Sequence, residues 1–312
     1  MSYQVLARKY RPRSFDDVVG QEHAVRALVN ALDKDRLHHA YLFTGTRGTG
    51  KTTIARILAN CLNCEEGVSS SPCGECDSCT EIIEGRFIDL IEVDAASRTG
   101  VDDTRDLLNN AQYLPTRGRF KVYLIDEVHM LSTPSFNALL KTLEEPPPHV
   151  KFLLATTNPQ KIPMTVLSRC LQFNLKNILP DVITEHLRSV LTQESFESDD
   201  VSLNVIARAA DGSLRDALSI ADQAVSYCGG SLEGDRVAEM LGTVRADEVT
   251  RLLDALADRD RIALFKCTNE LASRSADLAD VLDNLQRAFH ELAMAYATDT
   301  KPEGDLQNYT DR

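Results

Sequence analysis

Residues 45–52 read Gly-Thr-Arg-Gly-Thr-Gly-Lys-Thr, and this stretch limits the possible folds of the chain more than any other. An apolar stretch at 40–43 precedes it, and a run with helical spacing at 53–62 follows it. Glycines let the backbone curl so that several N–H groups point at phosphate oxygens, and a helix that begins there adds its positive end. The order strand, loop, helix therefore predicts a nucleotide phosphate site rather than a plain glycine-rich turn. Lys51 would reach the β- and γ-phosphates, and Thr52 would hold Mg²⁺.

The length and charge of the chain narrow the class of protein. With 312 residues there is room for two or three domains. The net charge is −13, and the whole excess of acid lies in residues 179–312. Phosphate contacts supply most nucleic-acid affinity, so a stand-alone nucleic-acid binder is disfavoured and any DNA contact should fall on residues 1–178. The sequence has neither a membrane span nor the apolar centre of a signal peptide, so we expect a cytoplasmic protein without membrane contact.

An acidic pair follows one of the predicted strands. Apolar runs predict strands at 87–93, 120–125, 150–156 and 171–175, and helical spacing predicts helices at 22–32, 101–112 and 136–143. Asp126 and Glu127 follow the second strand, at the edge where an open α/β sheet presents ligand-facing residues. We expect Asp126 to orient Mg²⁺ and Glu127 to take the proton from the attacking water. Thr157 and Asn158 end the third strand and could contact that water or the γ-phosphate, although a strand-capping turn explains them nearly as well.

Four cysteines have the spacing of a metal site. They are Cys64, Cys73, Cys76 and Cys79, joined by a short loop with glycine and proline. Such a set can surround one tetrahedral Zn²⁺, and with no open position for water the site would be structural. Disulfides are the rival interpretation, which a cytosolic setting disfavours. Cys61 is a fifth and weaker candidate, because it falls within the predicted phosphate-loop helix.

Two arginine-bearing stretches have both a structural and a functional interpretation, and a third indicates a ligand. The basic leader around Tyr10 and Arg11 could be a solvated arm or could wrap over a purine base. Arg169 could be a surface salt-bridge partner or an arginine finger for the γ-phosphate of a neighbouring subunit. Arg215 lies in the first turn of a helix that Ser213 is expected to cap. A cation there opposes the helix dipole, which indicates an anionic ligand nearby.

The second part of the chain should be helical. We expect no strands after residue 179, and helices at 180–191, 201–210, 213–227 and 235–241, followed by about three more from 246 to about 298. The Leu and Ala stripes of the last block are explained by core packing or by burial against another subunit. These patterns predict domains at 1–178, with the zinc insertion at about 61–80, at 179–242 and at 243–312.

The motifs, in this order, resemble the clamp-loader branch of the AAA+ ATPases, and most closely its bacterial gamma/tau family. Besides the phosphate loop and the four cysteines, the resemblance rests on Tyr10-Arg-Pro-Arg13, Val19-Gly-Gln21, Asp94-Ala-Ala-Ser97, Leu124-Ile-Asp-Glu-Val-His129, Asn137-Ala-Leu-Leu-Lys-Thr-Leu-Glu-Glu-Pro146, Ser168-Arg-Cys170 and Gly212-Ser-Leu-Arg-Asp216. It implies an α/β AAA+ domain with a parallel sheet, then a helical lid domain, then a helical collar. The chain ends early for that collar, so we expect a truncated form.

The resemblance also assigns roles to residues. It makes Arg169 a finger acting in trans, Arg215 a second phosphate sensor and Thr157 the polar sensor on the strand end, beside the catalytic Lys51, Asp126 and Glu127. It places Mg²⁺ at Thr52 and Asp126 and Zn²⁺ at the four cysteines. The implied nucleotide contacts are Ala7, Tyr10, Arg11, Pro12, Val19, Gly45, Thr46, Arg47, Gly48, Thr49, Gly50, Lys51, Thr52, Thr53, Asn158, Leu214 and Arg215.

The function implied by the resemblance is that of an ATPase motor subunit within a DNA polymerase III holoenzyme, with no polymerase active site of its own. Its partners would be delta, delta-prime and further gamma/tau subunits, a sliding clamp and primed-template DNA. Another AAA+ DNA remodeller, such as a recombination helicase or helicase loader, is the alternative enzyme. A nucleotide-binding scaffold that never hydrolyses is the alternative outside enzymes.

Overall fold

The computed structural model describes residues 4–97, 108, 110–242, 246–273 and 278–300. The chain divides into two compact units. The first is formed by Met1–Val190 with Ala207–Asp222, and the second by Leu191–Ile206 with Gln223–Arg312. Among the described residues, none of the helices combines the length and the hydropathy needed to cross a bilayer.

A five-stranded parallel sheet forms the centre of the first unit. Its strands are β1 (Ala40–Thr44), β2 (Leu90–Asp94), β3 (Lys121–Asp126), β4 (Val150–Thr156) and β5 (Leu171–Asn174), in the order β2-β3-β4-β1-β5. Thr44 pairs with Thr156 and with Asn174, and Asp94 pairs with Asp126. This register brings the carboxyl ends of the strands to one edge of the sheet, where an open α/β sheet binds its ligands.

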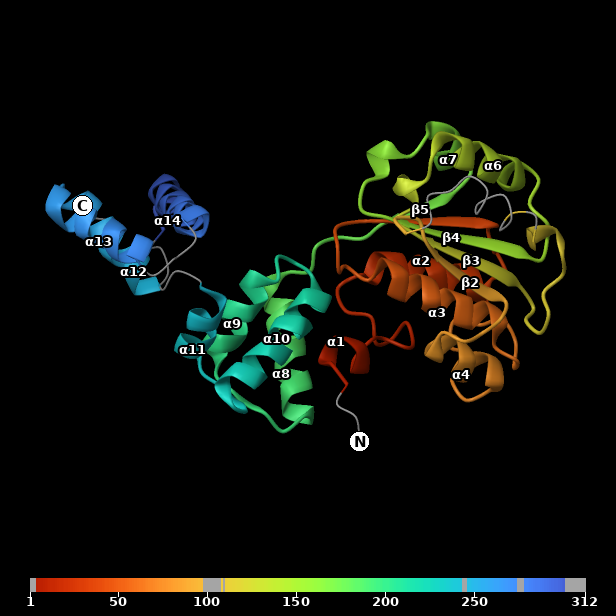
Figure 1. Cartoon of the computed structure of the whole chain (residues 1–312), viewed down its shortest axis with the longest axis horizontal. Coiled ribbons are helices and arrows are strands. Elements are labelled where there is room, and N and C mark those ends of the chain that lie inside the picture. The colour runs from red at the N-terminus through yellow and green to blue at the C-terminus, as the bar shows by residue number, and fades with distance from the viewer. Residues whose placement is uncertain (1–3, 98–107, 109, 243–245, 274–277, 301–312) are drawn as a thin grey trace. The chain divides into compact units, whose positions relative to one another are not determined.

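Helices cover both faces of this sheet, as Figure 1 shows. The helices and short 3₁₀ turns of this part are α1 (Leu6–Lys9), α2 (Glu22–Asp33), α3 (Lys51–Asn63), α4 (Asp77–Glu84), η1 (Asn110–Gln112), η2 (Val128–Met130), α6 (Thr133–Glu144), η3 (Pro159–Lys161) and α7 (Met164–Leu167). Tyr41 and Phe43 pack in the core with α2 and α3, whereas Leu42 packs in a second core with α6 and α7. Because successive side chains of a strand point to opposite faces, the continuous apolar run of β1 serves both cores.

The predicted strands and helices that lie within the described residues of this unit are found, and the boundaries of two of them changed for a clear reason. The strand predicted at 87–93 begins only at Leu90, because the buried carboxylate of Asp89 accepts the backbone N–H groups of Thr116, Arg117 and Gly118, each at 2.7 Å. The helix predicted at 136–143 begins at Thr133, since the Ser132 side chain accepts a hydrogen bond from the backbone N–H of Ser135. The helix predicted at 101–112 lies outside the described residues except for 108 and 110–112, and 110–112 forms η1.

Helices dominate the rest of the chain, as predicted. They are α8 (Pro180–Gln193), α9 (Asp200–Ala209), α10 (Leu214–Cys228), α11 (Gly234–Leu241), α12 (Ala246–Ala257), α13 (Arg261–Ser273) and α14 (Leu278–Thr298). The expectation of no strands after residue 179 is wrong, because β6 (Glu197–Ser198) and β7 (Ser231–Leu232) pair in parallel. The carboxylate of Asp199 accepts the backbone N–H groups of Ser202 and Gly234. These bonds join the segment after β6 to the segment after β7.

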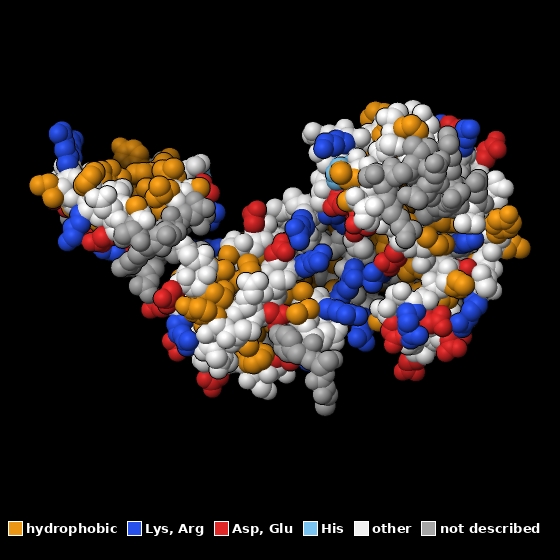
Figure 2. All heavy atoms as spheres, in the orientation of Figure 1, with side chains coloured by type: hydrophobic (Ala, Val, Ile, Leu, Met, Phe, Trp, Pro, Cys, Tyr) orange, Lys and Arg blue, Asp and Glu red, His pale blue; other side chains and the backbone are white. Residues whose placement is uncertain are grey.

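The last helices combine a small core with an exposed apolar surface. Leu252, Leu271 and Val281 are buried together. Several large apolar side chains of α13 and α14 remain exposed, and Figure 2 shows hydrophobic side chains gathered over this part of the second unit. They are Ile262, Phe265, Leu278, Leu282, Phe289, Met294 and Tyr296. The apolar stripes seen in the sequence therefore only partly pack within the described part of the chain.

Candidate functional site

The phosphate loop connects β1 to α3 and depends on its glycines. Gly45, Gly48 and Gly50 have φ values of 147°, 76° and 100°. A Cβ on Gly48 would lie 1.8 Å from the Ser213 Oγ, and a Cβ on Gly45 would lie 2.6 Å from the Leu175 carbonyl oxygen. Glycine is thus required for both backbone conformation and close approach. The first helical residue, Lys51, follows Gly50 directly, so the helix N-terminus opens onto the loop.

Lys51 is a buried cation held by the loop. Its side chain Nζ donates to the carbonyl oxygens of Gly45, at 3.0 Å, and Thr46, at 2.7 Å, and the residue is 6% exposed. Burial lowers the pKa of Lys51, and the carboxylates of Glu127 and Asp126 oppose that change. The loop therefore holds a localised positive charge beside two acids, which is the arrangement that binding a polyphosphate with a divalent cation requires.

The two predicted magnesium ligands lie in contact. Thr52 Oγ1 donates to Asp126 Oδ2 at 2.8 Å, although the two residues are far apart in the sequence. Asp126 Oδ1 accepts the backbone N–H of Glu127 at 3.0 Å. A hydroxyl and a carboxylate oxygen at the end of a buried strand are hard oxygen ligands, which suit Mg²⁺. These residues fit the ion chemically.

Glu127 has a strained backbone and a fully engaged carboxylate oxygen. Its φ of 47° lies in the left-handed region, which is unusual for a residue with a side chain. Its Oε2 accepts the backbone N–H of Thr157, at 3.0 Å, and the Thr157 hydroxyl, at 2.9 Å. The Nδ1 of His129 lies 3.2 Å from the same Oε2 and 2.9 Å from Thr156 Oγ1. Asn158, in contrast, donates its backbone N–H to Thr156 Oγ1 and directly precedes η3.

Two residues of this region were given no role by the sequence interpretation. His129 belongs to a quoted motif, but nothing in its spacing shows that it turns back toward Glu127. Gln21 is fully buried, and its side chain donates to the carbonyl oxygens of Thr49 and Lys176 while accepting the backbone N–H of Lys176. Gln21 thus joins the phosphate loop to the segment after β5, and the signal for it is a polar residue at the start of an apolar-faced helix.

The basic leader is attached to other segments of the first unit, which argues against the solvated arm. The buried Leu6 donates its backbone N–H to Asp222 Oδ2 at 2.6 Å, and Arg11 Nε donates to Thr53 Oγ1 at 3.2 Å. Burial lowers the pKa of Arg11 to about 10, helped by the nearby cations Arg56 and Arg215 and opposed by Glu92 and Asp126. The leader, the phosphate-loop helix and the start of α10 thus gather positive charge around one place.

Several other predicted nucleotide contacts lie close in sequence to Leu6, Arg11 and Arg215. Ala7 lies in α1, Tyr10 directly follows it, and Pro12 and Val19 lie in the segment that leads to α2. Leu214 is the first residue of α10, where Ser213 Oγ accepts the backbone N–H of Asp216 at 3.1 Å, as the predicted cap should.

Arg169 forms the salt bridge that one of its two interpretations predicted. Its NH2 group lies 2.7 Å from Glu144 Oε1, and its NH1 group donates to the Thr165 carbonyl oxygen at 2.7 Å. The side chain of Arg169 is 33% exposed and that of Glu144 is 52% exposed. A role as a trans finger stays a prediction.

The four predicted zinc ligands form one cluster. The sulfur atoms of Cys64, Cys73, Cys76 and Cys79 all lie within 4.8 Å of one another, with 3.6 Å between Cys64 and Cys73 and 3.9 Å between Cys73 and Cys79. Zinc–sulfur bonds of about 2.3 Å in a tetrahedron place the sulfurs about 3.8 Å apart. The donor set and its spacing therefore fit a closed Zn²⁺ site.

The surroundings of the thiols separate this cluster from Cys61. Backbone N–H groups of Cys76 and Glu75 lower the pKa of Cys73 to about 7, which favours the thiolate that a metal binds. Burial raises the pKa of Cys61 to about 12, and its thiol donates instead to the Ser70 carbonyl oxygen. Cys61 lies in α3 and outside the cluster.

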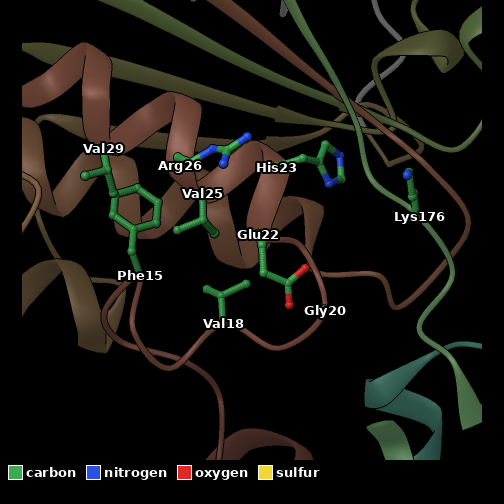
Figure 3. Close-up of a pocket in the computed structure, with 9 residues that line it drawn as sticks. All are labelled: Phe15, Val18, Gly20, Glu22, His23, Val25, Arg26, Val29 and Lys176. Atoms are coloured by element: carbon green, nitrogen blue, oxygen red, sulfur yellow. The ribbon is translucent and has the colours of Figure 1, made fainter. Parts of the chain in front are cut away.

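A pocket of about 590 Å³ lies beside α2 (Figure 3). The side chains of Phe15, Val25 and Val29 line its apolar part, and Arg26 and Lys176 are among its polar groups. Gly20 lines this pocket and directly follows Val19, one of the predicted nucleotide contacts. The pocket is therefore adjacent to the predicted base site but built mainly from other residues.

Comparisons with known proteins agree with this architecture. A family model described as "DNA polymerase III, delta subunit" matches residues 20–179, and one described as "DNA polymerase III clamp loader subunit, ATPase lid domain" matches residues 182–230. DNA polymerase III subunit tau of Escherichia coli K12 is 57% identical over 294 residues, covering 94% of this chain and 46% of the relative. DNA polymerase III subunit gamma of Buchnera aphidicola subsp. Baizongia pistaciae is 47% identical over 294 residues, covering 94% of this chain and 80% of the relative.

Solved structures with the same fold include the RuvB Holliday junction branch migration motor of Thermotoga maritima. The TM-score is 0.56 at 19% identity, covering 90% of this chain and 92% of that one. At that identity the likeness establishes an AAA+ fold and nothing about the reaction. The chain spans about half the length of the tau relatives that it matches.

Proposed function

This chain belongs to the clamp-loader family of gamma and tau subunits of DNA polymerase III, and from that premise we propose that it is an ATP-hydrolysing motor subunit of a clamp loader. With partner subunits it would open a ring-shaped sliding clamp and close it on primed DNA. The partners would be delta, delta-prime and further gamma/tau subunits.

The observation that carries the proposal is that Lys51, Thr52, Asp126 and Glu127 lie together at one edge of the sheet. Lys51 and the backbone N–H groups at the start of α3 bind the phosphates, and Thr52 with Asp126 would hold Mg²⁺. The ion would supply positive charge that neutralises the polyphosphate of the bound nucleotide. A scaffold that only binds nucleotide has no need of Glu127 in addition.

In this mechanism Glu127 accepts the proton of the attacking water, and Thr157 orients Glu127. The two hydrogen bonds from Thr157 hold one carboxylate oxygen, so the other oxygen of Glu127 remains to accept the proton. Arg215, and Arg169 from the next protomer, would stabilise the charge that develops on the transferred group. ATP binding would favour the state that grips the clamp, and hydrolysis would release it.

The remaining features support roles in assembly. The cysteine cluster would bind Zn²⁺ as a structural element beside α3, and the exposed apolar surface of α13 and α14 suits contact with other subunits. We propose the boundaries 1–178, 179–242 and 243–312 for the ATPase, lid and collar domains.

Turnover of ATP in the assembled complex tests the proposal. We expect the sliding clamp together with primed DNA to stimulate ATPase activity and a four-way junction not to do so; stimulation by the junction alone would favour the branch-migration alternative. Glu127→Gln should keep ATP affinity and lower kcat by about 10²- to 10⁴-fold. Undiminished turnover in that variant would remove Glu127 from the mechanism.

A further inference from the structure

The salt bridge between Glu144 and Arg169 lies between two elements that share one core. Glu144 is the last residue of α6, and Arg169 follows α7 by two residues. Leu139 and Leu143 of α6 are buried in the same cluster as Val166 of α7. The backbone on both sides of the salt bridge is therefore fixed by packing, which is what a precisely held side chain requires.

Two acceptors hold the Arg169 guanidinium. One is the Thr165 carbonyl oxygen, one turn back along the chain, and the other is Glu144 Oε1, each at 2.7 Å. The backbone N–H of Arg169 also donates to the Val166 carbonyl oxygen. An arginine side chain carries about 2 kcal/mol of rotamer entropy, so a guanidinium already held in one orientation has less to lose when it binds an anion.

We propose that Glu144 is a positioning residue for Arg169, holding the guanidinium in the orientation in which the next protomer's phosphate meets it. This inference rests on the proposed function, because it presumes that Arg169 acts in trans. The contrary idea is that Glu144 withholds the cation by competing with phosphate. The two ideas predict opposite changes in kcat when the Glu144 carboxylate is removed. Removing a competing negative charge would raise kcat, whereas removing a positioning contact would lower it.

The test measures clamp- and DNA-stimulated ATPase activity of the assembled complex for two substitutions. Glu144→Ala removes the acceptor and the charge, and we expect kcat to fall about tenfold with the KM for ATP unchanged, because a small misplacement of a catalytic group is enough to slow a reaction that much. Glu144→Gln keeps an acceptor oxygen at the same place and should retain most of the activity. A rise in kcat for either variant would overturn the positioning role.

Glu145→Ala is the matched control. It removes an equal charge one residue away, from an exposed residue whose backbone N–H bonds to the Lys141 carbonyl oxygen at the helix end. We expect this variant to keep the wild-type kcat. An equal loss in both alanine variants would mean a general effect of charge or of the helix end, and the specific role of Glu144 would be lost.

A double-mutant cycle separates this inference from the proposed function. If Glu144 acts only through Arg169, then adding Glu144→Ala to Arg169→Ala lowers kcat no further. Additive losses would overturn the inference while leaving the arginine finger intact. If Arg169→Ala itself leaves stimulated turnover unchanged, the finger in the proposed function is wrong, and the positioning role fails with it.

Discussion

At the scale of single residues, much of this protein depends on carboxylates that accept several backbone N–H groups. Asp89 fixes the turn before β3, and Asp199 joins the two short strands β6 and β7. Asp89 lies in an apolar run and Asp199 in a polar stretch, and in neither place does the sequence pattern indicate this structural role. Because the hydrogen bonds favour the charged carboxylate, the contribution of each residue to the free energy of unfolding should depend on pH.

Asp89 gives the clearest case. Burial alone would raise its pKa, but the three backbone N–H groups outweigh it and hold the pKa of Asp89 below its ordinary value. A lowered folded-state pKa means that the stabilisation is complete above the unfolded value of about 3.9 and is lost as pH falls through the folded value. Asp89→Asn should therefore lower the free energy of unfolding at pH 7 by about 2–3 kcal/mol, and by less below about pH 4.

Urea denaturation of wild type and variant at several pH values measures that difference. Asp77→Asn is the control, because the Asp77 side chain is 83% exposed and lies 3.6 Å from Arg117, so its effect should be small at every pH. A difference for Asp89→Asn that stays constant down to pH 3 would mean that the charge of Asp89 is not what matters.

At the scale of elements, local patterns predicted most of the sheet and the helices, and long-range contacts explain what they missed. The run from β1 through the phosphate loop to α3 is encoded locally by apolar residues, glycines and helical spacing. The pairing of β6 with β7 was missed because each has two residues and depends on Asp199. Likewise the approach of His129 and Thr157 to Glu127 and of Arg169 to Glu144 depends on how neighbouring strands and helices pack.

Close approach between elements makes a substitution of Gly48 a direct test of the phosphate loop. Gly48→Ala places a methyl group against Ser213, which caps α10, in addition to the cost of about 1–2 kcal/mol for a left-handed residue. We expect the affinity of the Gly48→Ala variant for ATP to be about tenfold lower than that of the wild type, or lower still. Gly85→Ala has the same kind of backbone, with φ 75° and nothing within 4 Å of the new Cβ, so it should lose stability but keep the wild-type Kd. Equal Kd values in fluorescence titrations would contradict the role of this contact.

The cysteine cluster makes a prediction for metal content. Purified protein should carry about one Zn²⁺ per chain, and Cys64→Ser should lose it and unfold at a lower temperature. Cys61→Ser is the control, since a serine hydroxyl can still donate to the Ser70 carbonyl oxygen. Metal analysis showing that Cys61→Ser also loses zinc would bring Cys61 back among the ligands.

At the scale of the whole molecule, the proposed active site requires two protomers. The Lys51→Ala variant has an impaired phosphate loop and an intact Arg169. The Arg169→Ala variant has an intact phosphate loop and lacks the arginine. Each variant alone should give almost no stimulated turnover. A 1:1 mixture assembled together should recover about a quarter of the wild-type sites, because random neighbours then pair an intact loop with an intact arginine. If the mixture stays as inactive as its parts, each site is completed within one chain.

The leader is fastened at two places, and this has a mechanical consequence. One attachment is to α10, through Leu6 and Asp222, and the other is to α3, through Arg11 and Thr53. Only four residues separate Leu6 from Arg11, so the backbone between the two attachments can extend little. Any movement of α10 relative to α3 must therefore displace Tyr10 and Arg11, which are expected to contact the base. Release of the hydrolysed nucleotide and the movement of α10 should then have the same rate constant. Stopped-flow fluorescence can test this with one label on α10 and another on the nucleotide, and the two traces should coincide.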